Sequence, residues 1–400
     1  MNFLFIPLWL TSIFLALPTV AGASSCTDIT LTVDASTYTH GIGLPDFFPR
    51  HPNFIDGFFN EAFSFIGRIW PFVAVEGSYN ISATLCEPEE YNHANAIQLL
   101  SHGATYNKFY WSGIGLPEEQ AKRYDWTRVA KNEGYATLAI DRLGAGNSSH
   151  PGPLLESHVN LEAEIFHQIV LKLRSGEIGD KKFSNVVYVG HSLGSLIGVR
   201  STQLYPRDYD ALVLTGWSAN FMVGIPKILA TGLRSARYII PDRFGDRSPF
   251  YVALSLPEYT RKAFYGLSRS FDPEVVEWDF NHRDVCSGGE LVSMMAGLTE
   301  TAYTGPVHLI VGEADSIFCG WSGKCSRGPD SPPGNARRLF PVAHSFTYDI
   351  IPDLGHCLNL HYDAEKVFES AHEFLRRSVE RQEGQSGQCS TFESVSLCHS

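Results

Sequence analysis

The sequence is poor in basic residues and has no run of five or more of them. It holds 31 Lys and Arg against 43 Asp and Glu, which gives a formal net charge of −12 at pH 7 with His neutral. A protein with this balance of charge is not attracted to anionic surfaces. We therefore expect no nucleic acid among its partners.

Motifs for metals and for dinucleotides are also missing. There is no H-E-x-x-H and no C-x-x-C, and the histidines are scattered along the chain. Residues 144–146 form a G-x-G, but no G-x-G-x-x-G stands at a junction between a strand and a helix. We expect neither a metal nor another cofactor.

Only one long apolar run is present, at residues 4–17 (LFIPLWLTSIFLAL). Pro18 ends it, and the small residues Ala21-Gly22-Ala23 follow, as at the cleavage site of a signal peptide. A membrane anchor is the alternative, but a helix that crosses the bilayer needs about 20 apolar residues. We expect cleavage after Ala23, secretion to the extracellular space, and no stable insertion into a membrane.

The eight cysteines agree with secretion, because all of them follow the proposed cleavage site. In an oxidising compartment an even number of cysteines suggests disulfides, here up to four. Two N-x-S sequons, at Asn80 and Asn147, are candidate glycosylation sites. Our first candidates for disulfide pairs are Cys319–Cys325, Cys389–Cys398 and Cys26–Cys86.

From about residue 75 the chain alternates between apolar runs and helical patterns. Short apolar runs separated by helices are typical of a parallel sheet that is covered on both faces, so the predicted fold class is α/β. The predicted strands are Val75–Leu85, which alternates like an exposed edge strand, and Ala96–Leu100, Tyr135–Ile140, Val186–Gly190, Ala211–Thr215, Val307–Val311 and Phe346–Ile351. The predicted helices are Leu116–Glu133, Leu161–Leu173, Leu193–Leu204, Asn335–Phe340 and Ala364–Arg377.

Three regions interrupt this alternation. Residues 35–74 are rich in Phe, Pro and Gly and predict an irregular flap. Residues 218–300 are mostly helical in pattern and lie between two core strands, which suits a lid over the carboxyl edge of the sheet. Residues 380–400 are typical of a polar surface tail. The predicted organisation is a signal peptide (1–23), a first strand and flap (24–74), a core in two parts (75–217 and 301–379), a helical cap (218–300) and a tail (380–400).

The motif Gly190-His191-Ser192-Leu193-Gly194 follows a strand and opens a helix, which is the setting of a nucleophile elbow. A tight turn of this kind strains the backbone of the serine and exposes its hydroxyl at the helix N-terminus. The helix dipole there favours developing negative charge. An ordinary tight turn is the alternative interpretation. We predict that Ser192 is a nucleophile.

A serine hydroxyl needs a base, and the base needs an orienting group. On this strand pattern an acid should follow a later strand and a histidine should follow the last one. The strand at 307–312 leads into Glu313 and Asp315, of which Asp315 is far enough past the strand to reach the histidine. The candidate base is His356, with His361 as its rival.

An oxyanion hole needs backbone N–H groups aimed at the oxygen of the tetrahedral intermediate. Leu193 supplies one, and Ala104, in the loop after the strand at 96–100, supplies the other. The turn at 141–146 predicts a structural brace for this edge of the sheet. Further candidates for contacts with the substrate are His102, His191 and Trp217.

With these residues assembled, the chain resembles the α/β-hydrolase superfamily over roughly residues 75–378. The matches are H-G at 102–103, D-R-x-G-x-G at 141–146, G-H-S-L-G at 190–194, G-E-A-D at 312–315 and G-H at 355–356. Residues 135–149 (YATLAIDRLGAGNSS) are similar to secreted α/β hydrolases of filamentous fungi. The resemblance implies an eight-stranded, mostly parallel sheet with helices on both faces and a helical cap inserted at about 218–300.

These residues predict a secreted serine hydrolase, of carboxylesterase or lactonase type, that cleaves a small apolar ester or lactone through an acyl-enzyme. The apolar preference rests on aromatic residues that could equally form the core of the cap: Trp217, Phe221, Tyr238, Phe250, Tyr251, Phe264 and Tyr265. Serine at the elbow argues against epoxide hydrolases and haloalkane dehalogenases, which hold a carboxylate there. Thioester, amide and carbon–carbon bond chemistry stay open. So do a tailoring enzyme acting on a polyketide-type intermediate, an inactive binding protein of the same fold, and the oligomeric state.

Overall fold

The computed structural model describes residues 26–40, 72–91, 93, 95–219, 224–266, 269–294, 298–319 and 325–389. The predictions of a signal peptide at residues 1–23, of a flap across residues 41–71 and of a disulfide to Cys398 fall outside this part of the chain. Within it, no helix combines the length and the apolar character needed to cross a membrane.

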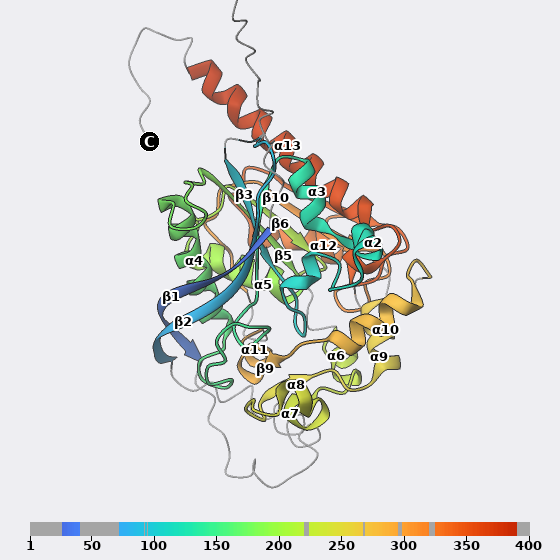
Figure 1. The fold of residues 1–400 in the computed structure, drawn as a ribbon. Helices are drawn as coiled ribbons and strands as arrows, with labels where there is room; N and C mark the ends of the chain where they lie inside the picture. Colours follow the sequence, from blue (N-terminus) through green and yellow to red (C-terminus); the bar gives the residue numbers. More distant parts are fainter. Residues whose placement is uncertain are drawn as a thin grey trace, which may run out of the picture.

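An eight-stranded sheet forms the centre of the molecule (Figure 1), in the order β1-β2-β4-β3-β5-β6-β10-β11. The pairs β1–β2 and β2–β4 are antiparallel and the other pairs are parallel, so the predicted mostly parallel sheet is confirmed. Every residue of β3, β4, β6 and β10 is buried, as expected for strands covered on both faces. The strands are β1 (Cys26–His40), β2 (Phe72–Cys86), β3 (Ala96–Ser101), β4 (Ala136–Ile140), β5 (Asn185–His191), β6 (Ala211–Thr215), β10 (Val307–Gly312) and β11 (Phe346–Ile351).

Helices cover both faces of this sheet. α4 (Val159–Ser175) packs against β1 and against α5 (Leu193–Leu204), whereas α13 (Ala364–Cys389) packs against α3 (Trp126–Asn132), β10 and β11. Figure 1 shows the strands between these two groups of helices. The apolar side chains of α4 that face inward are fully buried, among them Leu161, Ile165 and Ile169.

The first strand is longer than the sequence analysis predicted, and it changes which strand lies at the edge. β1 and β2 pair along their whole length, from Cys26 opposite Cys86 to His40 opposite Phe72. Residues 35–40 and 72–74, predicted as flap, therefore belong to strands. β1 is the edge strand, so the prediction that Val75–Leu85 is an exposed edge was wrong. β2 lies between β1 and β4, and Ile81 and Ala83, in that segment, are fully buried.

The helix predicted over Leu116–Glu133 is divided into α2 (Glu118–Ala121), a 3₁₀ turn (Lys122–Tyr124) and α3. Asp125 has an extended backbone, and its carboxylate accepts the N–H of Arg128 at 2.9 Å. A side chain that caps in this way starts a new helix, so Asp125 separates the two.

Two helices near the C-terminus also differ from the prediction. The hydroxyl of Ser331 caps α12 (Pro332–Asn335), and a 3₁₀ turn (Ala336–Leu339) follows, so the helix predicted from Asn335 begins earlier. α13 continues to Cys389, so residues 380–389 extend this helix rather than starting a tail.

The described residues of the segment 218–300 gather at one end of the sheet (yellow and orange in Figure 1). The segment was predicted to be helical, but it also contains a three-stranded sheet, β7-β8-β9, whose strands pair antiparallel. These strands are only two or three residues long. The elements are α6 (Ile225–Ala230), β7 (Arg234–Ser235), α7 (Ala236–Ile239), α8 (Pro241–Phe244), β8 (Tyr251–Ala253), α9 (Pro257–Phe264), α10 (Pro273–His282), β9 (Cys286–Ser287) and α11 (Gly288–Ser293).

Two of the predicted disulfides are present, Cys26–Cys86 and Cys319–Cys325. The first joins partners that lie opposite each other in the β1–β2 register. Cys286 and Cys357 are buried and unpaired, so four disulfides do not form.

Candidate active site

The turn between β5 and α5 holds Ser192 in a strained conformation. Its φ of 54° and ψ of −115° lie outside the regions that residues with a side chain usually adopt. The turn is tight because its glycines touch other backbone. A Cβ on Gly190 would lie 2.6 Å from the Cα of Ser195, and one on Gly194 would collide with the carbonyl oxygen of Ser101. This packing keeps Ser192 at the N-terminus of α5.

His356 lies between Ser192 and Asp315. Its Nε2 is 2.9 Å from Oγ of Ser192, and its Nδ1 is 3.0 Å from Oδ2 of Asp315. Asp315 is fully buried, and its Oδ1 accepts the backbone N–H groups of Ile317 at 2.9 Å and of Phe318 at 3.0 Å. Because a carboxylate only accepts, Nδ1 of His356 carries a proton and Nε2 can accept the proton of the serine hydroxyl. This geometry activates a serine as a nucleophile.

The two rival candidates lie elsewhere. Glu313 accepts the backbone N–H of Asp353 at 3.3 Å on the exposed side of the loop. His361 is buried, and its Nε2 accepts the N–H of Gly355 at 3.0 Å. It therefore supports the loop that carries His356 rather than replacing it.

Ala104 and Leu193 line the same cavity as Ser192 and His356. Leu193 is the first residue of α5, so its N–H has no acceptor within the helix. Gly103 allows the loop before Ala104 to touch the elbow, because a Cβ at this position would lie only 3.0 Å from the Cβ of Ser192. Both predicted donors of the oxyanion hole thus border the space in front of the serine.

His102, His191 and Trp217 are not among the described residues that line this cavity. All three are buried, at 1% exposure or less. The ring of His191 stacks on that of Tyr110, with 4.4 Å between centroids, and its centroid lies 5.0 Å from that of His356. Burial is the main cause that lowers the pKa of His102 and of His191, so both are neutral. The structure therefore places these three side chains in the interior, outside the lining of the cavity.

The cavity in front of Ser192 is apolar and encloses about 570 Å³, its open mouth included. None of its described lining residues carries a formal charge. Of the cap aromatics singled out in the sequence, Phe264 lines it, whereas Tyr238 is exposed and Tyr251 and Tyr265 are buried outside it. Thr105, whose hydroxyl the sequence offers as an addition to the oxyanion hole, also lines the cavity. The sequence analysis missed the rest of the lining, since scattered uncharged residues carry no signal of their own. These residues are Tyr106, Leu196, Ile228, Leu233, Leu254, Cys286, Leu291, Met294, Ile317 and Phe318.

A buried carboxylate lies next to this lining. Oδ2 of Asp279, in α10, accepts the hydroxyl groups of Tyr106 at 3.0 Å and of Tyr265 at 2.7 Å. The hydroxyl of Tyr106 is also 2.8 Å from Sγ of Cys357, the residue after His356. Burial raises the pKa of Asp279 to about 6, and the two hydroxyl donors oppose this effect.

Within the described residues, no group of three or more His, Cys, Asp and Glu side chains converges as metal ligands do. The groups that the structure brings together at this site are the serine, the histidine, the carboxylate and the backbone donors.

A family model described as "Alpha/beta hydrolase family" matches residues 98–369. No curated protein matches the chain. Among solved structures, the chain is similar to a thermophilic esterase from Thermogutta terrifontis, at 18% identity over 75% of this chain and 94% of that one, with a TM-score of 0.49. It is also similar to a putative aryl esterase from Burkholderia cenocepacia, at 16% identity over 76% and 96% of the two chains, with a TM-score of 0.49. A third similar structure is epoxide hydrolase A from Mycobacterium thermoresistibile, at 15% identity over 74% and 95%, with a TM-score of 0.46.

Proposed function

The chain belongs to the alpha/beta hydrolase family, and on this premise we propose that it is a serine hydrolase that cleaves a carboxylic ester or lactone. The observation that carries the proposal is the hydrogen-bonded chain from Ser192 through His356 to Asp315 at the wall of an apolar cavity.

The proposed reaction proceeds through an acyl-enzyme. Oγ of Ser192 attacks the carbonyl carbon while Nε2 of His356 takes its proton, and the carbonyl becomes an oxyanion that the N–H groups of Ala104 and Leu193 stabilise. The intermediate then expels the alcohol, which receives the proton from His356. Asp315 keeps the histidine in the tautomer that can accept at Nε2 and stabilises its charged form. Water, deprotonated by the same histidine, hydrolyses the acyl-enzyme and restores the serine.

The lining of the cavity supports a neutral, apolar substrate. No described lining residue is charged, so a carboxylate or ammonium group of a substrate would lose its hydration without gaining a partner.

We also propose that the protein is secreted. The apolar run at residues 4–17 supports this, as do the Cys26–Cys86 and Cys319–Cys325 disulfides, which are typical of oxidising compartments. Asn80 and Asn147 are both exposed, as glycosylated asparagines must be. Mass spectrometry of protein from the culture medium of a eukaryotic host, before and after deglycosylation, tests the cleavage and both sequons.

The test of the proposed function is labelling with a fluorophosphonate, read by intact mass, on the wild type and on Ser192→Ala. We expect one probe per wild-type chain and none on the variant, together with a loss of at least about 10³-fold in kcat/KM for p-nitrophenyl esters. A panel of acyl lengths then sizes the cavity. If folded wild-type protein takes up no probe, the serine is not activated, and a binding protein of this fold becomes the better hypothesis.

A further inference from the structure

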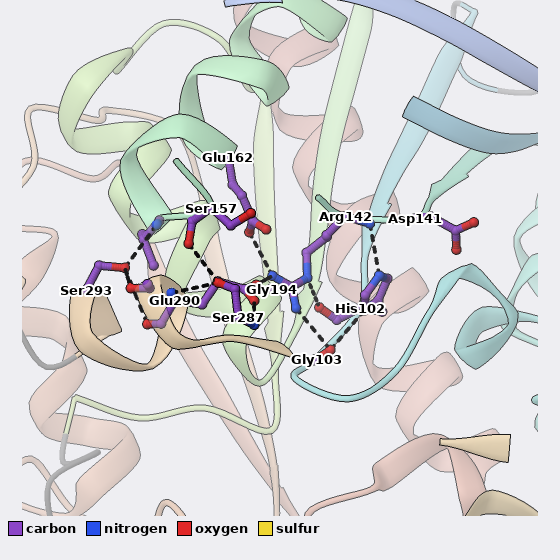
Figure 2. Close-up of polar contacts among 12 residues, drawn as sticks. His102, Gly103, Asp141, Arg142, Ser157, Glu162, Gly194, Ser287, Glu290 and Ser293 are labelled. Carbon is purple, nitrogen blue, oxygen red and sulfur yellow. Dashed lines mark hydrogen bonds and ion pairs between the residues drawn. The ribbon is translucent and has the colours of Figure 1, made fainter. Parts of the chain in front are cut away.

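Arg142 is buried against the loop that precedes Ala104 (Figure 2). Its Nε donates to the carbonyl oxygen of His102 at 3.0 Å, and one terminal nitrogen donates to that of Gly103 at 3.3 Å. Its other terminal nitrogen donates to the carboxylates of Glu162, at 2.7 Å, and of Glu290. The three charged side chains are each at most 2% exposed. The guanidinium therefore joins the loop to two acidic residues inside the protein.

The cluster places one guanidinium against two buried carboxyl groups. Burial by itself would lower the pKa of Arg142, but Glu162 and Glu290 raise it overall, so the guanidinium stays charged. Burial raises the pKa of Glu162 well above its usual value, and Arg142 opposes this effect. A buried cluster of this kind holds its geometry firmly, because breaking one ion pair leaves a buried charge without its partner.

The geometry of the peptide group shows what Arg142 controls. The group between Gly103 and Ala104 is planar and trans, so its C=O and its N–H point in opposite directions. The oxygen accepts from Arg142 and from Nδ1 of His102 at 2.8 Å, and Nε2 of His102 accepts the backbone N–H of Arg142 at 3.0 Å. With the oxygen held on this side, the N–H of Ala104 points to the other side, where Ala104 lines the cavity of Ser192.

We infer that Arg142 is a positioning residue that orients the Ala104 N–H toward the oxyanion. Through Glu290, this orientation also depends on the position of α11. The inference rests on the proposed function, since it assigns a role in the same reaction.

Glu290 connects the cluster to the region that borders the substrate. It stands at the third position of α11, where its carboxylate accepts the N–H of Ser287 at 2.6 Å and its own N–H is capped by the Ser287 hydroxyl. That hydroxyl also donates to the carbonyl of Ser157 at 2.7 Å, which ties the start of α11 to the loop before α4 (Figure 2). Leu291 and Met294, in and just after the same helix, line the cavity. α11 therefore connects the wall of the cavity to the contact between Glu290 and Arg142.

The first test is Arg142→Lys, which keeps the charge but lacks the planar fork that reaches two carbonyl oxygens and two carboxylates at once. We expect kcat for a p-nitrophenyl ester to fall about 10²-fold, while KM changes less than about threefold, because one oxyanion donor is misdirected. The affinity for a trifluoromethyl ketone, which forms a tetrahedral adduct on the serine, falls by a similar factor.

The matched control is Arg174→Lys. Arg174 likewise donates to two carbonyl oxygens, those of Ser184 and Asp208, and to one carboxylate, that of Asp210. These acceptors precede β5 and β6, at the opposite edge of the sheet from Ser192. We expect kcat, KM and the ketone affinity of Arg174→Lys to stay within about threefold of the wild type.

Glu290→Gln is the second variant, for the case in which Arg142→Lys fails to fold. It keeps one acceptor oxygen in place of the two that receive Arg142 and the N–H of Ser287, and its amide group cannot ionise. We expect a fall in kcat of about fivefold and, again, a parallel loss of ketone affinity.

Amide hydrogen exchange tests the inference without any need for activity. The peptide that contains residues 102–106 should exchange faster in Arg142→Lys and in Glu290→Gln, while the peptide of β5 should not change. Unchanged exchange at 102–106 overturns the inference. A loss of activity in the variants that is fully accounted for by a smaller fraction of folded protein also overturns it. If the wild type takes up no fluorophosphonate, the proposed function fails, while the exchange result still decides whether Arg142 holds the loop.

Discussion

Two buried clusters join the segment 218–300 to the core, and they compensate their charges in different ways. In one, Arg142 lies between the carboxylates of Glu162 and Glu290. In the other, Asp279 accepts two tyrosine hydroxyl groups, from Tyr106 and Tyr265, and is not ion-paired within the part of the chain that the structure describes. Both clusters adjoin catalytic candidates, the first at the loop of Ala104 and the second at the residue after His356.

Because the two clusters compensate their charges differently, we expect them to respond differently to pH and to substitution. A carboxylate beside a guanidinium depends on that one cation, so removal of the cation is costly at any neutral pH. A carboxylate held by neutral hydroxyl groups loses its charge easily, since a proton relieves the cost of burial. Asp279 is therefore the group that we expect to respond to mild acid, whereas the Arg142 cluster responds to substitution.

The largest effect is expected for Arg142→Met. This change leaves Glu162 and Glu290 buried without a cation, and we expect the free energy of unfolding to fall by about 3–5 kcal/mol. Urea denaturation at pH 7.5 measures the loss. Adding Glu162→Gln and Glu290→Gln to the same chain should recover most of it. A loss below about 1 kcal/mol in the single variant would mean that the cluster is not dry or not paired.

The next effect concerns pH. Asp279 has a pKa raised from 3.8 to about 6, so the folded state binds a proton that the unfolded state releases. Its contribution to stability is fully present below about pH 4 and is lost as the pH rises through about 6. The shift in the pKa of Asp279 corresponds to a change of about 3 kcal/mol in the free energy of unfolding. Asp279→Asn removes this dependence, so the unfolding free energies of variant and wild type should diverge between pH 4 and pH 7.5.

The groups that face Asp279 do not interfere with this measurement. Burial raises the pKa of Tyr106, of Tyr265 and of Cys357 well above their usual values, and Arg283 stays charged throughout the range. Parallel curves for wild type and Asp279→Asn would therefore show that Asp279 keeps an ordinary pKa.

The smallest effect is expected for the two tyrosines. Tyr265→Phe removes one hydrogen bond to Asp279 and should lower the free energy of unfolding by about 1–2 kcal/mol, with KM for p-nitrophenyl esters unchanged. Tyr106→Phe removes a similar bond at the wall of the cavity, so it should change KM as well. Equal effects of both changes on KM would contradict the structure, in which Tyr106 lines the cavity and Tyr265 does not.

Much of the fold could be predicted from patterns within short segments of the sequence. The strands at 211–215 and 346–351 and the helix at 193–204 have the predicted bounds, because runs of strand-forming residues and a strand–turn–helix motif are visible within a dozen residues. The candidates Asp315 and His356 came from the rule that such side chains follow the carboxyl ends of parallel strands, and the structure brings both to Ser192.

The features that were missed depend on pairing between distant residues. β7 and β9 are two residues long, too short for any alternation to show in the sequence. The contact between Arg142 and Glu290 joins positions 148 residues apart. Nothing local to either residue marks the other, so D-R-x-G-x-G could be interpreted as a turn but not as the centre of a charged cluster.

The β1–β2 pair also determines how the chain is connected covalently. The strands bring His40 opposite Phe72 at one end, and the Cys26–Cys86 bond closes the other. A protease that cuts anywhere in residues 41–71 would therefore produce two polypeptides that stay linked. On a denaturing gel they would migrate as one band until a reductant separates them, so the nicked protein would pass for intact in any assay run without thiol.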